Sequence, residues 1–365
     1  MNKDTIILTR RIQLLINSSD KEEIKESYQK LYDWRYACFR AANYIFTHLF
    51  LQEQIKDLFY LDEGIRVKLA DIKKDENGIF NLSRMGTIYQ VLSKNFKGEV
   101  PMAIVSNLNT TLFKNFNNER LSYLKGERTL RNYKREIPIP FAGKEVRNWQ
   151  LTDDQRNYTC TLFGMPFLTY LGRDFSDKKL LLDKMMAGMV KFCSGSIQIK
   201  DNKIFLLAAF QMEKEKHSLD ASVIAEASLS IDYPVTVTIG KSHYTIGSRE
   251  EFLHRRLAIQ AARQRFLKGA RYNRGGKGRS KKLKALAHYT ETEKNYVTSR
   301  LHLYSRMLID ICIKHAAATL ILTGQQEKEA VAKEDGFLLR NWSYYELKEK
   351  ISYKAEKAGI TIIVE

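Results

Sequence analysis

A single acidic residue stands in an apolar stretch of the sequence. Residues 229–239, LSIDYPVTVTI, combine apolar and β-branched side chains around one carboxylate, Asp232. The pattern predicts a β-strand that carries this acid. A strand carboxylate can serve acid–base or metal chemistry only when partner groups lie beside it. The function of Asp232 therefore depends on which other residues join it.

The cysteines and histidines offer no obvious partners. The four cysteines, Cys38, Cys160, Cys193 and Cys312, are far apart, and no histidine lies three to five residues from another. Without a C-x-x-C pair, a structural zinc site has no visible ligand set, and a disulfide framework is not expected in a cytoplasmic chain. We expect ordinary core or surface thiols and no metal site.

The residues best suited to binding lie in the basic stretch from His254 to Arg300. It holds fourteen Lys or Arg residues against two acids, Glu291 and Glu293, and so supplies about +12 of the formal charge of +18. The predicted nucleic-acid contacts in this stretch are Arg255, Arg256, Arg263, Arg265, Lys268, Arg271, Tyr272, Arg274, Lys277, Arg279, Lys281, Lys282 and Lys284.

The layout of the basic stretch favours binding to a phosphate backbone. Its cations recur on predicted helices that also carry an apolar face, and Gly275, Gly276 and Gly278 are expected in a flexible loop between them. Cations on such helices can contact successive phosphates, while aromatic residues such as Phe266 and Tyr289 stack on bases. The glycines lack the spacing of a phosphate-binding P-loop. A solvated helical face is the alternative.

Composition agrees with a nucleic-acid partner. The 365 residues are 44% hydrophobic and 11% aromatic, which is typical of a folded chain of two or three domains. A net charge of +18 favours polyanions, nucleic acid first, with a basic membrane-surface protein as the alternative. The sequence has no apolar run of about 18 residues and no signal-peptide pattern. We expect a cytoplasmic protein without a membrane partner.

Periodicity predicts a multidomain α+β protein. Residues 1–16 are expected to contain a strand, 17–134 helices, and 135–225 short strands that include a hairpin turning at Asp201 and Asn202. Residues 226–365 follow the element order of an RNase H-like α/β unit. That range contains a second hairpin turning at Gly240, a basic helical insertion over 250–318, and a helix with a Ser343–Glu346 capping box that stops at Gly359.

Several of these segments resemble a known family. The C-terminal part resembles the RuvC-like domain of transposon-encoded TnpB proteins and of the compact type V CRISPR effectors descended from them. The similar segments are SIDYP, the basic stretch, KNYVTSRLHLYSRMLIDICIKHAA and NWSYYELKEKISYKAEKAGI. Upstream, VPMAIVSNLNTTLFKNF and KGERTLRNYKREIPIPF look like the end of the recognition helices and the entry to the wedge domain. The resemblance covers most of the chain, best over 100–141 and 228–365.

The resemblance implies a specific domain layout. It gives a first wedge strand over 1–16, a helical recognition domain over 17–134, a barrel-like wedge domain over 135–225, and a RuvC-like RNase H-fold domain over 226–365. The zinc ribbon that follows in the family is expected to be missing here. The resemblance also adds weaker candidates for nucleic-acid contact, each of which has a structural role as its alternative. These are Arg128, Tyr133, Lys134 and Arg135.

The chain departs from the family at the nuclease site. The family's nucleases hold two Mg²⁺ ions with a strand Asp, a Glu on a later strand and a late Asp. Here the Glu position falls on Thr323 or Gly324, Glu327 lies past the expected strand end, and the sequence stops at Glu365. The resemblance therefore predicts a vestigial Asp232, no catalytic residues, no catalytic Mg²⁺, and no enzyme activity.

These features together predict RNA-guided, sequence-specific binding of double-stranded DNA without cleavage. The expected role is transcription regulation, by repression or by recruitment of a sigma factor or RNA polymerase, with a guide RNA as the bound component and a homodimer on one guide RNA as an option. One alternative is a Mg²⁺-dependent RNA-guided endonuclease completed by a nonstandard acid or a partner subunit. The other is a general RNA-binding ribonucleoprotein factor.

Overall fold

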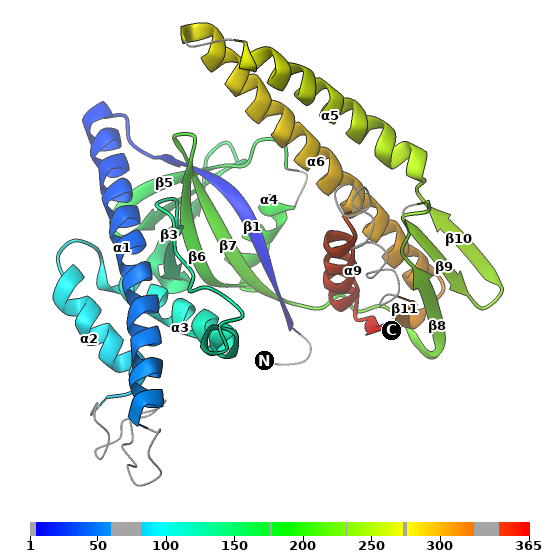
Figure 1. The fold of residues 1–365 in the computed structure, drawn as a ribbon, viewed down its shortest axis with the longest axis horizontal. Coiled ribbons are helices and arrows are strands. Elements are labelled where there is room, and N and C mark those ends of the chain that lie inside the picture. Colours follow the sequence, from blue (N-terminus) through cyan, green and yellow to red (C-terminus); the bar gives the residue numbers. More distant parts are fainter. Residues whose placement is uncertain (1–4, 60–81, 175–176, 231, 273–275, 325–342) are drawn as a thin grey trace. The chain divides into compact units, whose positions relative to one another are not determined.

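The computed structural model describes residues 5–59, 82–174, 177–230, 232–272, 276–324 and 343–365 (Figure 1). The chain divides into two compact units, residues 7–212 and residues 213–365 together with 1–6. Among the described residues, every helix is too short or too polar to cross a bilayer.

The first unit begins with a strand and three helices. These are β1 (Thr5–Ile16), α1 (Lys21–Phe59), α2 (Arg84–Phe96) and α3 (Met102–Leu124). Acids in the first turn of α1 complement its dipole, and the hydroxyl of Ser83 accepts a hydrogen bond from the Gly86 N–H at the start of α2 (3.1 Å). The opening strand is confirmed. The helices expected over 17–134 are also confirmed in the described part of that range, and residues 60–81 lie outside it.

The rest of the first unit is a seven-stranded sheet with short helical segments. Its further elements are β2 (Ile139–Ala142), η1 (Gly143–Glu145), β3 (Val146–Leu151), β4 (Tyr158–Leu162), β5 (Met165–Tyr170), α4 (Lys178–Met186), β6 (Lys191–Lys200) and β7 (Lys203–Glu213). The strand order is β2-β6-β7-β1-β5-β4-β3, so the N-terminal strand lies in the middle. The predicted hairpin is confirmed, because β6 pairs antiparallel with β7 and both Asp201 and Asn202 take positive φ at the turn.

A buried charge cluster joins the three helices of the first unit. The Glu53 carboxylate on α1 is fully buried and pairs with Arg84 on α2 and with Arg120 on α3 (2.7 Å to Arg120 Nε). Arg84 also donates to the side-chain oxygen of Gln52. A buried carboxylate is tolerated only when it is paired and hydrogen-bonded in this way. The cluster thus fixes how α2 and α3 pack on α1.

The second unit is a mixed five-stranded sheet covered by helices. Its elements are β8 (Asp220–Ser228), β9 (Val235–Ile239), β10 (Ser242–Ile246), α5 (Arg249–Arg271), α6 (Gly276–Lys314), β11 (Ala317–Leu322), α9 (Tyr344–Ala358) and β12 (Thr361–Val364). The strand order is β10-β9-β8-β11-β12. β8, β9 and β10 pair antiparallel, whereas β11 runs parallel to β8 and to β12. The hairpin with Gly240 at its turn and the last helix and strand are confirmed.

The strand expected over 229–239 is confirmed only in its second half, where β9 covers Val235–Ile239. Before it lies a separate strand, β8, which ends at Ser228, and a turn closed by Ser230 and Tyr233 leads into β9. The Ser230 hydroxyl donates to the Tyr233 carbonyl (3.0 Å) and accepts from the Tyr233 N–H (3.2 Å). Pro234 cannot donate to a strand ladder and ends the turn. Asp232 therefore lies in an exposed turn, not on a strand.

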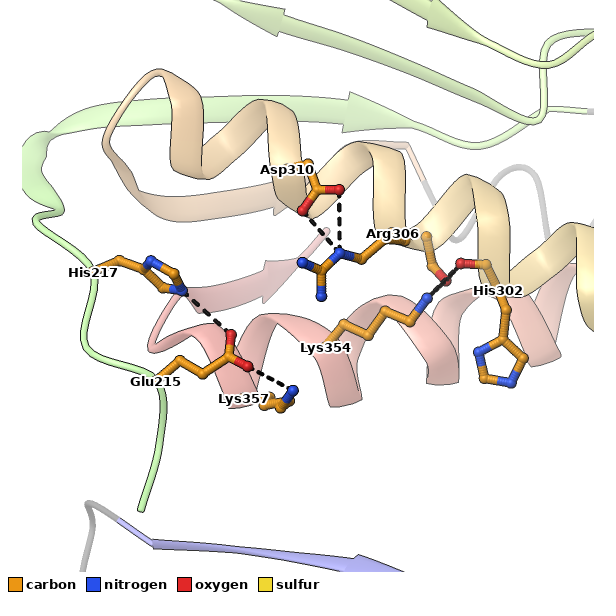
Figure 2. A network of polar contacts seen from close by, with 8 residues as sticks. Glu215, His217, His302, Arg306, Asp310, Lys354 and Lys357 are labelled. Atoms are coloured by element: carbon orange, nitrogen blue, oxygen red, sulfur yellow. Dashed lines mark hydrogen bonds and ion pairs between the residues drawn. The ribbon is translucent and has the colours of Figure 1, made fainter. Parts of the chain in front are cut away.

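Helix α9 packs against α6 through buried apolar residues. Figure 2 shows a polar contact between the same two helices. The ammonium of Lys354 on α9 donates to the His302 carbonyl and to the Ser305 hydroxyl (2.9 Å) on α6. Burial lowers the pKa of Lys354 from 10.5 to about 8. At the far end of α9, the Glu215 carboxylate lies between Lys357 (2.6 Å) and His217 (3.3 Å).

The ends of α9 partly differ from the prediction. Ser343 occupies the N-cap position, but its side chain makes no capping hydrogen bond, so the predicted capping box is wrong. Gly359 ends the helix in the left-handed conformation (φ 77°), as predicted. The thiols also follow expectation: all four cysteines are free, and burial raises the pKa of Cys38, Cys160 and Cys312 to about 12.

Replacing Glu53 with Gln should destabilise the first unit strongly. The substitution leaves Arg84 and Arg120 without their shared anion, and loss of one partner from a buried pair costs about 3–5 kcal/mol. Chemical denaturation measures the change in unfolding free energy. Glu22→Gln, at an exposed pair with Lys25, is the matched control and should shift stability by less than about 0.5 kcal/mol. Equal stabilities for the two variants would contradict the assigned role.

Lys354 should make stability depend on pH in the alkaline range. Its pKa is lower in the folded than in the unfolded chain, so the unfolded chain binds more protons between about pH 8 and 10.5. The contribution of Lys354 to stability therefore rises with pH across that window. Thermal melts of Lys354→Met should show a flatter pH profile than the wild type, whereas Lys241→Met, in the exposed β9–β10 turn, should keep the wild-type profile. Parallel profiles for the wild type and Lys354→Met would refute the prediction.

Candidate nucleic-acid interface

Most of the predicted contacts lie on a hairpin of two helices, α5 and α6 (Figure 1). Ser248 caps α5, because its hydroxyl accepts a hydrogen bond from the Glu251 N–H (3.2 Å). Acids occupy the first turn of α5 and cations its last turn, as the helix dipole favours. Phe252 is buried where α5 meets α6 and packs beside Tyr296 and Tyr304. The apolar contacts thus hold two strongly basic helices together.

Arg256 joins the two helices of the hairpin. Its guanidinium donates to the Glu293 carboxylate (3.0 Å), and both side chains are almost buried, with 11% and 13% exposed. Gln260 donates to the same Glu293 oxygen (2.7 Å). This seam between α5 and α6 favours a structural role for Arg256 over the predicted contact with nucleic acid, because its charge is already neutralised inside the protein.

The remaining cations of the hairpin are largely exposed. Arg263 is half-buried, and Tyr272 is 87% exposed. Seven of the predicted contacts are basic side chains that the structure shows as exposed. These are called here the hairpin cations: Arg255, Arg265, Lys268, Arg271, Lys277, Lys281 and Lys284. Positive charge at this density on two adjacent helices favours a polyanion.

Some predicted residues cannot be placed. Arg274 and Gly275 lie outside the described residues, as do the side chains of Arg279 and Lys282. Gly276 and Gly278 are in the first turns of α6, so the expectation of a loop at these two glycines is wrong. Phe266 and Tyr289 pack on each other across the hairpin, with ring centroids 5.2 Å apart. Their rings therefore stabilise the contact between α5 and α6, which is a different role from the predicted stacking on bases.

The candidates upstream mostly engage other protein groups. Arg128 pairs with Glu119 (3.0 Å). Tyr133 packs its ring on Phe46, its hydroxyl is buried, and burial raises its pKa. These contacts favour the structural alternative for both residues.

The two neighbouring candidates remain accessible. The Arg135 guanidinium lies over the Tyr36 ring at 5.7 Å, and the Lys134 side chain is exposed. Whether Lys134 and Arg135 contact nucleic acid stays a prediction.

Asp232 has a partner that the sequence did not reveal. Its carboxylate accepts a hydrogen bond from Arg249 at the start of α5 (3.3 Å), and its backbone carbonyl accepts from the Arg249 N–H (2.8 Å). The Asp232 side chain is 67% exposed. The only sign of this pair in the sequence is that Arg249 lies shortly before the predicted basic stretch. The pair ties the turn after β8 to the start of the hairpin.

The carboxyl ends of the central strands meet at one sheet edge. The N–H of Thr323, just after β11, donates to the Ala227 carbonyl on β8 (2.9 Å), and the N–H of Glu365, after β12, donates to the Leu322 carbonyl (3.0 Å). Asp232 follows β8 by four residues. Within the part of the chain that the structure describes, no group of three or more His, Cys, Asp or Glu side chains could hold a metal ion. These residues alone do not fit a magnesium pair.

Comparison with known proteins finds similar sequences. No family model matches the chain. The CRISPR-associated endodeoxyribonuclease Cas12f1 of Sulfoacidibacillus thermotolerans is 26% identical over 259 residues, which cover 66% of this chain and 60% of that protein. The Cas12f1 of Syntrophomonas palmitatica is 27% identical over 202 residues, 52% of this chain and 40% of that protein. The alignment therefore spans less than two thirds of the length of either relative.

A solved structure shares the fold. The cryo-EM structure of a Cas12f1–sgRNA–target DNA complex aligns with a TM-score of 0.66 at 18% identity, over 99% of this chain and 89% of that one. The predicted α+β fold is confirmed at this level, with a curled antiparallel sheet and helices. The detailed domain ranges and the lack of a zinc ribbon stay predictions.

The comparison also corrects one expectation. The prediction that the chain is not an enzyme is wrong, because its matching relatives are named endodeoxyribonucleases. The chain is homologous to Cas12f1, a compact type V CRISPR effector, in sequence and in fold.

Proposed function

We propose that this chain binds a guide RNA and, through the guide, a matching double-stranded DNA. The observation that carries the proposal is the α5–α6 hairpin. Its exposed cations greatly outnumber the acids nearby, so most of their positive charge is not neutralised by the protein. Cations spaced along two helices contact phosphates and do not read bases, so binding of this kind is independent of sequence. Base pairing with a guide supplies the sequence recognition that the protein surface lacks.

A structure with the same fold supports RNA and DNA as the ligands. The Cas12f1 structure that shares the fold is of a complex with sgRNA and target DNA. A protein that stays bound at a site chosen by a guide obstructs transcription through that site. We include this control of transcription in the proposal, by obstruction or by recruitment of transcription machinery.

Mg²⁺-dependent cleavage of the bound DNA is a second candidate function. The names of the relatives favour it. Asp232 and Glu365 lie near the carboxyl ends of β8 and β12, but two-metal hydrolysis needs further carboxylates. The sequence has four acids between β11 and α9, Glu327, Glu329, Glu334 and Asp335, all outside the described residues. These acids or a partner subunit would have to complete the site.

Binding should depend on the match between guide and target. The purified protein is loaded with the RNA that co-purifies with it, or with that RNA carrying a scrambled spacer, and its affinity for labelled target duplex is measured. The matched guide should bind the target at least tenfold more tightly, because only pairing with the guide distinguishes one duplex from another. Equal affinities would contradict the guided proposal and favour a general RNA-binding factor.

The same complexes test cleavage. Products cut at a defined position with Mg²⁺, and absent with EDTA, are the expected result of the second candidate. A target that stays bound and intact in Mg²⁺ would contradict cleavage and would be consistent with guided binding.

Reversing two hairpin cations should weaken binding and reduce its salt dependence. Lys281→Glu combined with Lys284→Glu changes two exposed residues near the start of α6, where acids do not oppose the helix dipole. The slope of log affinity against log salt should fall by about 1 to 2. Lys216→Glu with Lys241→Glu makes the same change in net charge on exposed residues outside the hairpin. If both pairs lower affinity equally, only net charge matters and the hairpin is not the binding surface.

A further inference from the structure

A polar cleft lies between α5 and α6, in the half of the hairpin nearest the start of α5. Both helices contribute to its lining, which consists of Arg255, Thr292, Asn295, Tyr296, Ser299 and Arg300. Only Arg255 is among the contacts predicted from sequence. The others are spaced three and four residues apart along α6, so they share one face of that helix. No carboxylate is among the lining residues.

The two arginines of the cleft are held over one tyrosine ring. The Cζ atoms of Arg255 and Arg300 lie 5.4 and 5.7 Å from the ring centroid of Tyr296. The Tyr296 hydroxyl donates to the Glu251 carbonyl (2.9 Å) and so fixes the ring on α5. Guanidinium groups held by cation–π contacts are ordered before a ligand arrives, which lowers the entropy cost of binding.

The charge of the cleft suits a singly charged anion. Arg300 pairs with Glu251 (2.5 Å), so one of the two positive charges is balanced. Arg255 is exposed and forms no ion pair with an acid among the described residues. The net charge of these three side chains is therefore about +1, which matches the single negative charge of a phosphodiester.

The cleft also offers neutral donors. Asn295 and Ser299 are exposed on the same face of α6, and neither forms a side-chain hydrogen bond within the described part of the chain. An amide and a hydroxyl beside a guanidinium can donate to the nonbridging oxygens of a phosphate. The arginine supplies a planar fork that matches a phosphate in two hydrogen bonds.

We infer that this cleft binds one backbone phosphodiester of a nucleic acid, with Arg255 as its main charged contact and Asn295 and Ser299 as hydrogen-bond donors. The inference rests on the proposed function in that the ligand is nucleic acid, but it needs no guide. The phosphate can belong to RNA or to DNA, since the chemistry that recognises it is the same.

The test measures salt dependence with two probes that need no guide. The full chain is titrated with a labelled single-stranded RNA and a labelled duplex DNA of random sequence, each at several salt concentrations. Arg255→Gln should lower the slope of log affinity against log salt by about 0.7 with RNA or about 0.9 with duplex, which is the loss of one phosphate contact. Arg255→Lys should keep the slope but bind less tightly, because it retains the charge and loses the fork. Asn295→Ala should lower affinity without changing the slope.

Controls separate this effect from general ones. Lys241→Gln removes an equal charge from an exposed turn of the same unit and should leave both slopes unchanged. Thermal melts should show that Arg255→Gln folds like the wild type, since Arg255 makes no buried ion pair within the described residues.

Each outcome bears on the inference. A smaller slope with RNA alone, with duplex alone or with both supports it and identifies the source of the phosphate. Unchanged slopes with both probes, or a wild type that binds neither, would overturn it. A reduced slope in a protein whose binding ignores the guide would support the cleft and contradict guided DNA binding, so the two failures are distinguishable.

Discussion

The second unit depends on holding two basic helices side by side. Like charges on adjacent helices repel over a distance of about 8–10 Å at physiological salt, so the α5–α6 hairpin needs attraction along its seam. Glu293 supplies part of it, because one almost buried carboxylate accepts hydrogen bonds from both Arg256 and Gln260 of the other helix. The buried Phe252 and the Phe266–Tyr289 contact supply apolar packing. With the seam neutralised, the outward cations are left for a ligand.

This division of labour explains why the cations of one stretch are not equivalent. Arg256 and Arg255 are neighbours in sequence, yet a helix turns by about 100° between them. One therefore points into the seam and meets Glu293, while the other lies over Tyr296 at the cleft. A helix of this kind uses some of its charge for its own stability and leaves the rest for the binding proposed above. A count of cations overstates the number of phosphates that the surface can contact.

The sheet of the second unit links the hairpin to the edge where Asp232 lies. Pro234 and the Ser230 hydroxyl close the turn after β8, and the Asp232 carbonyl and carboxylate both accept from Arg249, the first residue of α5. An exposed acid that pairs with one arginine is accessible to solvent and to ligands. The parallel pairing of β8 with β11 and of β11 with β12 brings the residues that follow these strands to the same edge. The edge thus gathers the carboxyl ends of β8, β11 and β12 in one place.

The sequence by itself determined the hairpins at Asp201 and at Gly240, the long helices, the basic stretch and the helix stop at Gly359, because these depend on local periodicity, turn chemistry and charge. It also indicated the family through the order of its motifs. Only the tertiary structure decided that Asp232 leaves the sheet, that Arg256 is neutralised by a residue 37 positions away, and that Arg255 and Arg300 share one ring. The reason is physical: which face of a helix a cation occupies follows from its local geometry, but which group it meets there follows from the packing of distant segments. The strand β8, rich in Ala and Ser and weak in β propensity, likewise forms because β9 and β11 pair with it on both sides.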